Sequence, residues 1–340
     1  MQTTRQRLKF LFLFLIAFML VIVATFSYFG SHYSSIKSSE SSIIRGVTDV
    51  EERHYYNIHS WQDLVPVTST RKVKRIIYNR VGKCGSRTMI QLISSLARKR
   101  DFTVIGSTRY KLLHLDLRDQ VEFVDFIDNL RAPFIYHHHV HFVDFKRFGA
   151  VQPIYINLIR DPLARLVSAY YYRRFGDYRE GHRTWGFKGT EKQKNQSFDE
   201  CVLNDVSECV DPGKIFYIVP FFCGHEAFCR QPSQLALKQA KINVMLNYLV
   251  VGVTEELQDF LSVLEKLLPD FFTGVLELYK APGDVLQKGM TTTKTANKKG
   301  PSPKVAAIVK KHLEIEYDFY NFVKDRFHRL KAELGLRTAA

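Results

Sequence analysis

Residues 82–88, Gly-Lys-Cys-Gly-Ser-Arg-Thr, have the composition of a loop that binds an anion. They lie between a β-branched run and a segment with apolar residues at helical spacing. Glycines let the backbone approach a ligand, and the first amides of the following helix point outward with the positive end of its dipole. A Walker A loop differs, since it has four residues between its first glycine and a Gly-Lys-Ser/Thr ending. On these residues alone, an ordinary polar turn between a strand and a helix is the alternative.

A second basic position follows another apolar run. Arg160 follows the predicted strand at 154–159, and Asp161 and Pro162 are the residue types that open a helix as N-cap and N1. Ser168 lies on that predicted helix. The segment therefore places a guanidinium group at a strand end and a hydroxyl group on the helix that follows.

Four histidines, at positions 137, 138, 139 and 141, fall within a predicted strand over 134–142. Because side chains alternate along a strand, His137, His139 and His141 are expected on one face and His138 on the other. Three interpretations are open at this point. The histidines are ligands of a zinc ion, although no nearby carboxylate completes the set, or polar core residues, or they include a general base that takes a proton from a hydroxyl group.

The elements that must position these residues alternate between strands and helices. Strands are predicted over 75–81, 134–142, 154–159 and 249–253, and helices over 89–96, 117–130, 162–174, 255–268 and from 301 to 334. Alternation of this kind predicts an α/β fold, a mostly parallel sheet flanked by helices on both faces. The stretch from 72 to 340 is long enough for one such domain.

The loop and the Arg160–Ser168 segment together resemble the carbohydrate sulfotransferases of the Golgi. Further stretches narrow the resemblance to the hexuronyl 2-O-sulfotransferase family, which has heparan sulfate and uronyl branches and includes the insect protein Pipe. These stretches are Tyr-Asn-Arg-Val-Gly-Lys (78–83), His-Val-His-Phe (139–142), Arg-Phe-Gly-Asp (174–177), Phe-Asp-Glu-Cys (198–201), Pro-Phe-Phe-Cys-Gly (220–224) and Val-Gly-Val-Thr-Glu-Glu (251–256). The resemblance implies a P-loop-like fold that uses PAPS (3′-phosphoadenosine 5′-phosphosulfate) as sulfuryl donor.

The resemblance assigns the donor-binding residues. It implies that the loop at 82–88 holds the 5′-phosphosulfate and that Arg160 and Ser168 hold the 3′-phosphate. It also implies that a C-terminal loop, which residues 294–301 resemble, closes over the nucleotide. The residues carried over are Lys83, Cys84, Gly85, Ser86, Arg87, Thr88, Arg160, Ser168, Tyr279, Thr295 and Lys298. Cys84 is interpreted as a structural thiol and not as a nucleophile.

The resemblance also assigns the chemistry. His139 matches the family's general base and His137 a second catalytic histidine, while Lys83 neutralises charge on the departing oxygen. The arginines Arg80, Arg174 and Arg179 are expected to bind an acidic acceptor, because guanidinium groups suit carboxylates and sulfates.

The acceptor is expected to be a glycosaminoglycan. Residues 82–87 look more like the uronyl branch of the family, which acts on chondroitin and dermatan sulfate, than like the heparan branch. This likeness favours chondroitin and dermatan sulfate over heparan sulfate. Pipe-like members imply a glycoprotein acceptor as the alternative.

Charge and hydropathy predict the compartment. The 49 Lys and Arg against 34 Asp and Glu give a formal net charge of +15, which suits a polyanionic partner. Residues 10–29 carry no charge and, as a helix, are long enough to cross a bilayer. Basic residues precede this run, and none follows it until Lys37. We therefore expect a type II signal anchor, with a cleaved signal peptide as the alternative.

The predicted topology has four parts. They are a cytosolic tail over 1–9, the transmembrane signal anchor over 10–29, a lumenal stem over 30–71 and a lumenal sulfotransferase domain over 72–340. A lumenal domain excludes nucleic acid as a partner, and the family resemblance implies the Golgi membrane.

Cysteines and a sequon agree with a lumenal domain. Cys201, Cys209, Cys223 and Cys229 lie close together, and short loops favour the disulfides Cys201–Cys209 and Cys223–Cys229. A zinc site is the alternative, but these spacings are not those of a finger or ribbon. Asn195 begins an Asn-Gln-Ser acceptor sequon and is a predicted glycosylation site.

Two other classes of protein share some of these features. A non-catalytic, membrane-anchored glycosaminoglycan-binding protein would have the anchor, charge and disulfides, but no need for two phosphate-binding segments. A metal-dependent hydrolase would use the histidines, whereas the sulfotransferase interpretation requires no metal. The family resemblance further implies a homo-oligomer, namely a trimer.

Overall fold

The structure is a computed structural model that describes residues 73–107, 113–179 and 187–336. The chain divides into two units, residues 1–59 and 60–340, and all described residues belong to the second. The predicted tail (1–9), anchor (10–29) and stem (30–71) lie outside the described residues. Among the helices that are described, none has both the length and the apolar character to span a bilayer.

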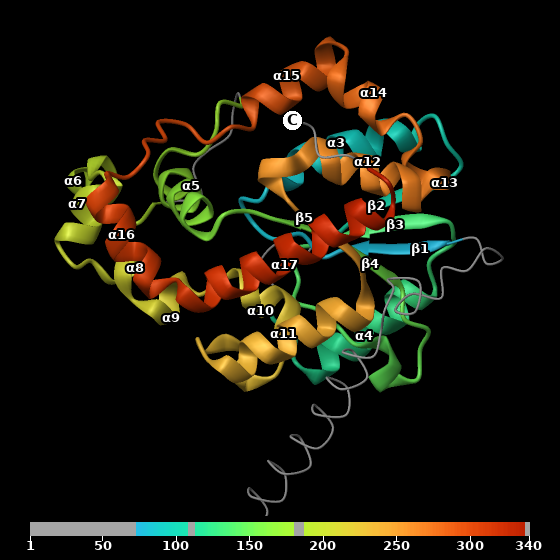
Figure 1. The fold of residues 1–340 in the computed structure, drawn as a ribbon, viewed down its shortest axis with the longest axis horizontal. Coiled ribbons are helices and arrows are strands. Elements are labelled where there is room, and N and C mark those ends of the chain that lie inside the picture. The colour runs from blue at the N-terminus through green and yellow to red at the C-terminus, as the bar shows by residue number, and fades with distance from the viewer. Residues whose placement is uncertain (1–72, 108–112, 180–186, 337–340) are drawn as a thin grey trace, which may run out of the picture. The chain divides into compact units, whose positions relative to one another are not determined.

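Five parallel strands form one sheet in the order β2-β3-β1-β4-β5 (Figure 1). The strands are β1 (Arg75–Tyr78), β2 (Thr103–Gly106), β3 (Phe134–His137), β4 (Ile154–Ile159) and β5 (Tyr248–Val253). The predicted parallel sheet is confirmed, and β2 is a short edge strand that the sequence pattern did not indicate. Because all five strands run the same way, their carboxyl ends meet at one edge of the sheet, where α/β proteins bind ligands.

Helices cover both faces of this sheet (Figure 1). The longer ones are α3 (Ser86–Ala97), α4 (Leu117–Asp128), α5 (Pro162–Phe175), α11 (Gln234–Asn247), α12 (Leu257–Leu267), α16 (Pro303–His312) and α17 (Glu314–Glu333). The shorter ones are η1 (Phe145–Phe148), α6 (Glu191–Asn195), α7 (Phe198–Leu203), α8 (Ser207–Val210), α9 (Pro212–Ile215), α10 (Ile218–Cys223), η2 (Ala227–Arg230), η3 (Thr254–Glu256), α13 (Pro269–Phe272), α14 (Val275–Lys280) and α15 (Asp284–Thr292).

Alternation along β1 separates two hydrophobic cores. Ile77 packs into the core on one face of the sheet, with apolar residues of α4, α10 and α11. Ile76 and Tyr78 pack into the core on the other face, with apolar residues of α3, α12 and α13. Since both faces are covered, the strand reads as a continuous apolar run. A third core joins α5, α7 and α16.

The predicted strand over 134–142 is wrong in its second half, because β3 ends at His137. Its neighbours β1 and β2 end opposite that residue, at Tyr78 and Gly106, so no ladder partner remains beyond it. The chain then packs against α10, where the Phe142 N–H donates to the Phe221 carbonyl at 2.9 Å. The alternation expected for the histidines therefore does not hold after His137.

The long helix predicted from residue 301 is two helices, α16 and α17, which meet at the buried Leu313. The chain turns there because the two helices serve different cores. α16 packs against α5, α7 and α8, whereas α17 packs against β5 and α11. Similarly, the helix predicted over 255–268 begins with the 3-10 turn η3 and becomes α-helical at Leu257.

Candidate active site

Most of the predicted site residues come from the end of β3 and from the segments that follow β1, β3 and β4 at the carboxyl edge of the sheet, whereas Tyr279, Thr295 and Lys298 come from later in the chain. The loop at 82–88 joins β1 to α3, the histidines follow β3, and Arg160 follows β4. β1 lies between β3 and β4 in the sheet, so the loop begins between the other two segments. The topology thus brings together residues that are far apart in the sequence.

The backbone of the loop prepares the first turn of α3 to bind an anion. Gly85, the N-cap residue, has φ +72°, and a Cβ there would lie 3.3 Å from Thr254 Cγ2. Among the described residues no side chain caps the helix, and its first turn contains no acidic residue. The first amides of α3 are therefore available to a phosphate, in the positive end of the helix dipole. Lys83 also has a positive φ, of 68°.

Lys83 lies in a cationic, partly buried position. Its Nζ is 3.7 Å from the centre of the Tyr172 ring, a cation–π contact with α5. Burial first, and then the charges of Arg87, Arg160 and Lys298, lower the pKa of Lys83 to about 7. An incoming phosphate would relieve this repulsion, so the position favours an anionic ligand.

The expected 3′-phosphate residues meet the C-terminal loop. Ser168 on α5 lies 3.0 Å from Thr295, Oγ to Oγ1. Burial and then the charge of Arg160 lower the pKa of Lys298. Arg160 makes no hydrogen bond or ion pair with another described residue. The predicted 3′-phosphate pair, Arg160 and Ser168, thus meets the two residues predicted in the C-terminal loop, since Ser168 contacts Thr295 and Arg160 lies near Lys298.

The side chain of Arg87, in the first turn of α3, is held in place by two residues, Tyr172 and Asp177. It forms an ion pair with Asp177, and its Nη2 donates to the Tyr172 hydroxyl at 2.5 Å. Burial is the first cause that lowers the pKa of Arg87, and the charge of Arg179 adds to it. The loop's arginine therefore has a fixed direction.

His139 has the hydrogen-bonding state of a general base. Its Nδ1–H donates to the Arg80 carbonyl at 2.7 Å, which leaves the Nε2 lone pair to accept a proton. Burial and then the charge of Arg80 lower the pKa of His139 to about 3, so the imidazole is neutral near pH 7. Arg80 thus lies beside the histidine, and its role as an acceptor-binding residue stays a prediction.

The other histidines differ in environment. The His137 ring lies against Gly106 of β2, where a Cβ would be 2.7 Å from His137 Cε1, and its buried Nδ1 has no hydrogen-bond partner among the described residues. Burial and then the charge of Arg80 lower the pKa of His137 to about 4. His141 is buried and donates from Nδ1 to the Gly224 carbonyl at 3.1 Å. A second catalytic role for His137 stays a prediction.

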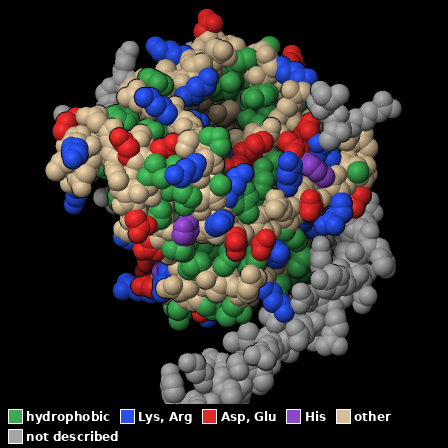
Figure 2. All heavy atoms as spheres, turned by 60° about the vertical axis from the view of Figure 1, so that its left-hand side comes forward, with side chains coloured by type: hydrophobic (Ala, Val, Ile, Leu, Met, Phe, Trp, Pro, Cys, Tyr) green, Lys and Arg blue, Asp and Glu red, His purple; other side chains and the backbone are tan. Residues whose placement is uncertain are grey.

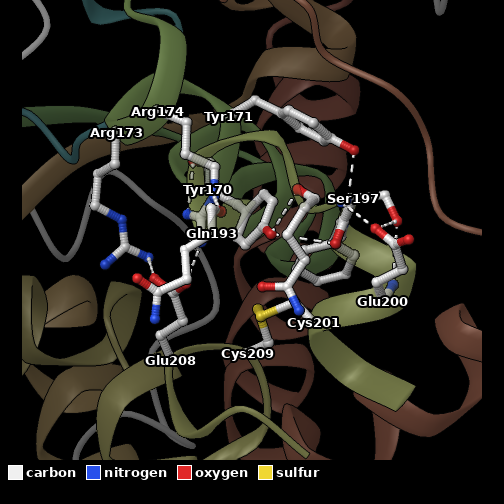
Figure 3. Close-up of polar contacts among 12 residues, drawn as sticks. Tyr170, Tyr171, Arg173, Arg174, Gln193, Ser197, Glu200, Cys201, Glu208 and Cys209 are labelled. Carbon is white, nitrogen blue, oxygen red and sulfur yellow. Dashed lines mark hydrogen bonds and ion pairs between the residues drawn. A yellow bond between two sulfur atoms is a disulfide. The ribbon is translucent and has the colours of Figure 1, made fainter. Parts of the chain in front are cut away.

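Arg174 is a structural residue, and its prediction as a substrate ligand is wrong. Its side chain is 1% exposed, forms an ion pair with Glu208 and donates from Nε to the Gln193 carbonyl at 3.2 Å (Figure 3). The guanidinium also lies 3.6 Å from the centre of the Tyr170 ring. An arginine with these partners is satisfied inside the protein, so it cannot reach an acceptor.

Arg179, a predicted acceptor-binding residue, is partly exposed, whereas Cys84, predicted to be a structural thiol, is buried. Arg179 retains 39% of its side-chain exposure while its Nε contacts Asp177 at 3.1 Å, which is compatible with an acceptor contact. The Cys84 thiol is fully buried, and burial raises its pKa to about 12. Cys84 can therefore contribute only its backbone to a bound ligand. Gly85, Ser86 and Thr88 are the other predicted ligand-binding residues in this part of the loop.

Tyr279 lies on α14 and packs, partly buried, against the core shared with α3. No described contact joins it to the loop, and its nucleotide-binding role stays a prediction. The disulfides Cys201–Cys209 and Cys223–Cys229 are confirmed. Asn195, the predicted glycosylation site, is exposed at the end of α6.

Sequence reasoning missed two residues that organise the site, Tyr172 and Asp177. Tyr172 lies one helical turn after Ser168 on α5, so the i, i+4 spacing could have placed both on one face. Asp177 belongs to the Arg-Phe-Gly-Asp stretch and is a buried carboxylate among basic residues.

The excess positive charge does not form a uniform surface. Both signs of charge share the face drawn in Figure 2, and Lys and Arg side chains gather beside a hollow in its upper part. A mixed surface with local basic regions suits recognition of a polyanion at defined places.

Comparison with known proteins confirms the family resemblance. The profile of the sulfotransferase family matches residues 68–323. Uronyl 2-sulfotransferase of Mus musculus and that of Homo sapiens are each 41% identical over 266 residues, which cover 78% of this chain and 65% of theirs. Heparan sulfate 2-O-sulfotransferase 1 of Xenopus laevis is 41% identical over 266 residues, 76% of this chain and 71% of that protein. The matched part is thus about two thirds of these relatives' length.

Proposed function

Because the chain belongs to the sulfotransferase family, we propose that it transfers a sulfuryl group from PAPS to the 2-hydroxyl of uronic acid residues in a glycosaminoglycan. The observation that carries this proposal is the shared sheet edge. An anion-binding helix start, a neutral histidine with an open Nε2 and Arg160 follow the neighbouring strands β1, β3 and β4, and Ser168 of the helix after β4 contacts Thr295.

The donor side acts through charge and position. The amides of α3 with Ser86, Arg87 and Thr88 bind the 5′-phosphosulfate, and Arg160 and Ser168 bind the 3′-phosphate. Sulfuryl transfer resembles phosphoryl transfer, with in-line attack and charge building on the leaving oxygen. As the bond between sulfur and the bridging phosphate oxygen breaks, the Lys83 ammonium neutralises that oxygen.

The acceptor side acts through His139. The sugar oxygen forms a bond to sulfur while its proton passes to Nε2, and the Arg80 carbonyl stabilises the imidazolium through Nδ1–H. This carbonyl also fixes the ring's tautomer and direction. Arg80 and Arg179 bind the acidic groups of the polymer, since both remain partly exposed beside the site.

Among polymers, we propose chondroitin or dermatan sulfate. The identity to the uronyl and heparan sulfate relatives is equal, at 41%, so the preference rests on the sequence of residues 82–87. We also propose that the domain lies in the Golgi lumen, which the predicted signal anchor and the disulfides support, and that the protein is a homotrimer, which the family resemblance supports.

A transfer assay with labelled donor tests the proposal. The full chain in detergent would be incubated with sulfur-labelled PAPS and, in parallel, with chondroitin, dermatan sulfate, heparan sulfate and a desulfated control. We expect label at the uronyl 2-position of chondroitin or dermatan sulfate. Label on heparan sulfate alone would contradict the polymer assignment, and binding of PAPS without label on any polymer would favour a glycoprotein acceptor.

Binding without transfer distinguishes the other class. A chain that binds these polymers but neither PAPS nor PAP (3′-phosphoadenosine 5′-phosphate, the donor's product) would be an anchored glycosaminoglycan-binding protein. That result would contradict the enzyme assignment as a whole.

A further inference from the structure

We infer that Asp177 is a positioning residue. It joins three parts of the site: the donor loop (residues 82–88), the predicted acceptor-binding residue Arg179, and the C-terminal loop that contains Thr295. The inference rests on the proposed transfer reaction and extends it to a residue that contacts neither substrate in that scheme. Its consequence is that donor and acceptor affinity change together when Asp177 is altered.

The carboxylate of Asp177 lies between two guanidinium groups. Its side chain has no exposed surface and forms ion pairs with Arg87 of the donor loop and with Arg179, whose Nε is 3.1 Å from Oδ1. A buried carboxylate is costly unless it is paired, and both arginines contribute to keeping it there. Equally, the carboxylate determines where both guanidinium groups lie.

The backbone of Asp177 is fixed by a different set of contacts. Asp177 forms an antiparallel bridge with Thr295, whose hydroxyl lies 3.0 Å from that of Ser168. On either side, the Ala296 N–H donates to the Gly176 carbonyl at 3.1 Å and the Tyr178 N–H donates to the Thr292 carbonyl at 2.9 Å. The residue that holds the two arginines is therefore also tied to the loop expected to close over the nucleotide.

Two effects of Asp177 on nucleotide affinity oppose each other. Its negative charge repels a phosphate, so charge alone predicts that Asp177→Asn tightens nucleotide binding. Without the carboxylate, however, Arg87 and Arg179 repel each other and lose their fixed directions. Because guanidinium groups bind phosphate in a defined planar geometry, positioning predicts weaker binding. The sign of the change therefore separates the two explanations.

The chain offers a matched control in Glu208. Glu208 pairs with Arg173 and the buried Arg174 at the same end of α5 (Figure 3). Glu208→Gln thus removes a comparable arginine–carboxylate pair that has no contact with the donor loop among the described residues. It reports the effect of a loosened helix end alone.

The experiment measures PAP binding by calorimetry and the acceptor KM, using the full chain. For Asp177→Asn we expect PAP binding at least tenfold weaker and a raised acceptor KM, with both values for Glu208→Gln within twofold of the parent. We also expect the double variant Arg87→Gln/Asp177→Asn to bind PAP no more weakly than Arg87→Gln, because Asp177 acts through Arg87.

Several results would overturn the inference. They are unchanged or tighter PAP binding in Asp177→Asn, weakening to the same extent in Glu208→Gln, or a weakened donor affinity with an unchanged acceptor KM. If Asp177→Asn does not fold, Asp177→Glu keeps the charge and displaces the carboxylate, and unchanged values for both ligands would overturn it. A parent protein that binds no PAP would instead contradict the proposed reaction itself.

Discussion

The surroundings of Lys83 disfavour its charged form until an anionic ligand binds. Burial and three neighbouring cations lower its pKa to about 7, from 10.5, so a large fraction of Lys83 is neutral at about pH 8. Phosphate groups favour the charged form and raise that pKa again. We therefore predict that PAP binding takes up a proton at about pH 8 and little at about pH 6.

Calorimetry in two buffers of different ionisation enthalpy measures this uptake. The apparent binding enthalpy should depend on the buffer at the higher pH, and the dependence should be reduced in Lys83→Met. Equal enthalpies in both buffers at about pH 8 would show that Lys83 already carries its full charge in the free protein.

Cys84, the residue after Lys83, lies in the same loop, where a thiol could be taken for a nucleophile, but its burial prevents this role. Its Sγ lies 3.6 Å from the Gly82 carbonyl with no exposed surface, and its pKa of about 12 keeps it a thiol. We predict that Cys84→Ala retains transfer within about threefold, since no kinetic role is lost and the cavity is small.

Labelling with iodoacetamide gives a second measure, because the other four cysteines form disulfides. Native protein should stay unlabelled, and denatured, unreduced protein should take one label. Rapid labelling of the native chain, with loss of transfer, would contradict a structural role.

Motifs in the sequence named candidate site residues that the fold brings near one another, whereas the prediction for Arg174 failed because burial decides what that side chain contacts. Arg160, Ser168 and Thr295 are separated in the chain, and the structure brings Ser168 and Thr295 to within 3.0 Å. Arg174 and Arg179 look alike in the sequence, but one is buried against Glu208 and the other remains partly exposed. Composition reports the charge of a side chain but not the partner that satisfies it.

At the scale of elements, the N-cap residue of α10, Tyr217, contacts the loop at 82–88. Glu316 of α17 is buried and accepts hydrogen bonds from the N–H groups of Tyr217, Ile218 and Val219 at the start of α10. The Tyr217 hydroxyl in turn lies 2.7 Å from where a Cβ of Gly82 would be, so a larger residue there would collide with it. A carboxylate on one helix thus fixes the start of another, which contacts the loop.

We predict that Glu316→Gln lowers the free energy of unfolding by about 2–4 kcal/mol, because the new side-chain NH2 group has only N–H donors of α10 beside it and the attraction between Glu316 and Arg165 is lost. Urea denaturation measures the change. Glu314→Gln, at an exposed position two residues earlier, is the control and should change it by less than about 0.5 kcal/mol. Equal effects of the two substitutions would contradict the capping role.

The elements themselves were predictable to different degrees. β4 and the start of α5 follow from a β-branched run and an Asp-Pro helix start, and both were predicted at their observed residues. The end of β3 was not, because a strand ends where its neighbours end and the chain's own composition continues unchanged through Val140. The break between α16 and α17 likewise depends on which core each helix packs against.

At the scale of the whole molecule, buried neutral histidines make stability depend on pH. Burial is the first cause that lowers the pKa of His137 and His141 to about 4, and that of His139 and His225 to about 3. Below about pH 6.5 the unfolded chain binds protons at these positions while the folded chain does not. Stability is therefore complete above that pH and declines as the pH falls toward the folded-state values.

Each of these four histidines contributes up to about 2 kcal/mol over this range, so we predict a loss of about 4–8 kcal/mol in the free energy of unfolding between about pH 7 and pH 5. Urea midpoints at the two values measure it. The variant His141→Gln keeps a side-chain N–H donor for the Gly224 carbonyl but has no imidazole to protonate. Its free energy of unfolding should therefore fall less steeply as the pH is lowered. A midpoint that does not move between these pH values would mean that the histidines protonate inside the folded chain.

The proposed transfer depends most directly on His139, because the donor site alone would only bind a nucleotide. The decisive measurement compares the parent chain with His139→Ala in the labelled-donor assay on the preferred polymer, alongside PAP binding by calorimetry. We predict that transfer falls by at least about 100-fold, the usual contribution of a general base, while PAP binding changes by less than about twofold. Transfer to the uronyl 2-position retained within about tenfold, with normal PAP binding, would contradict the assignment of His139 as the base.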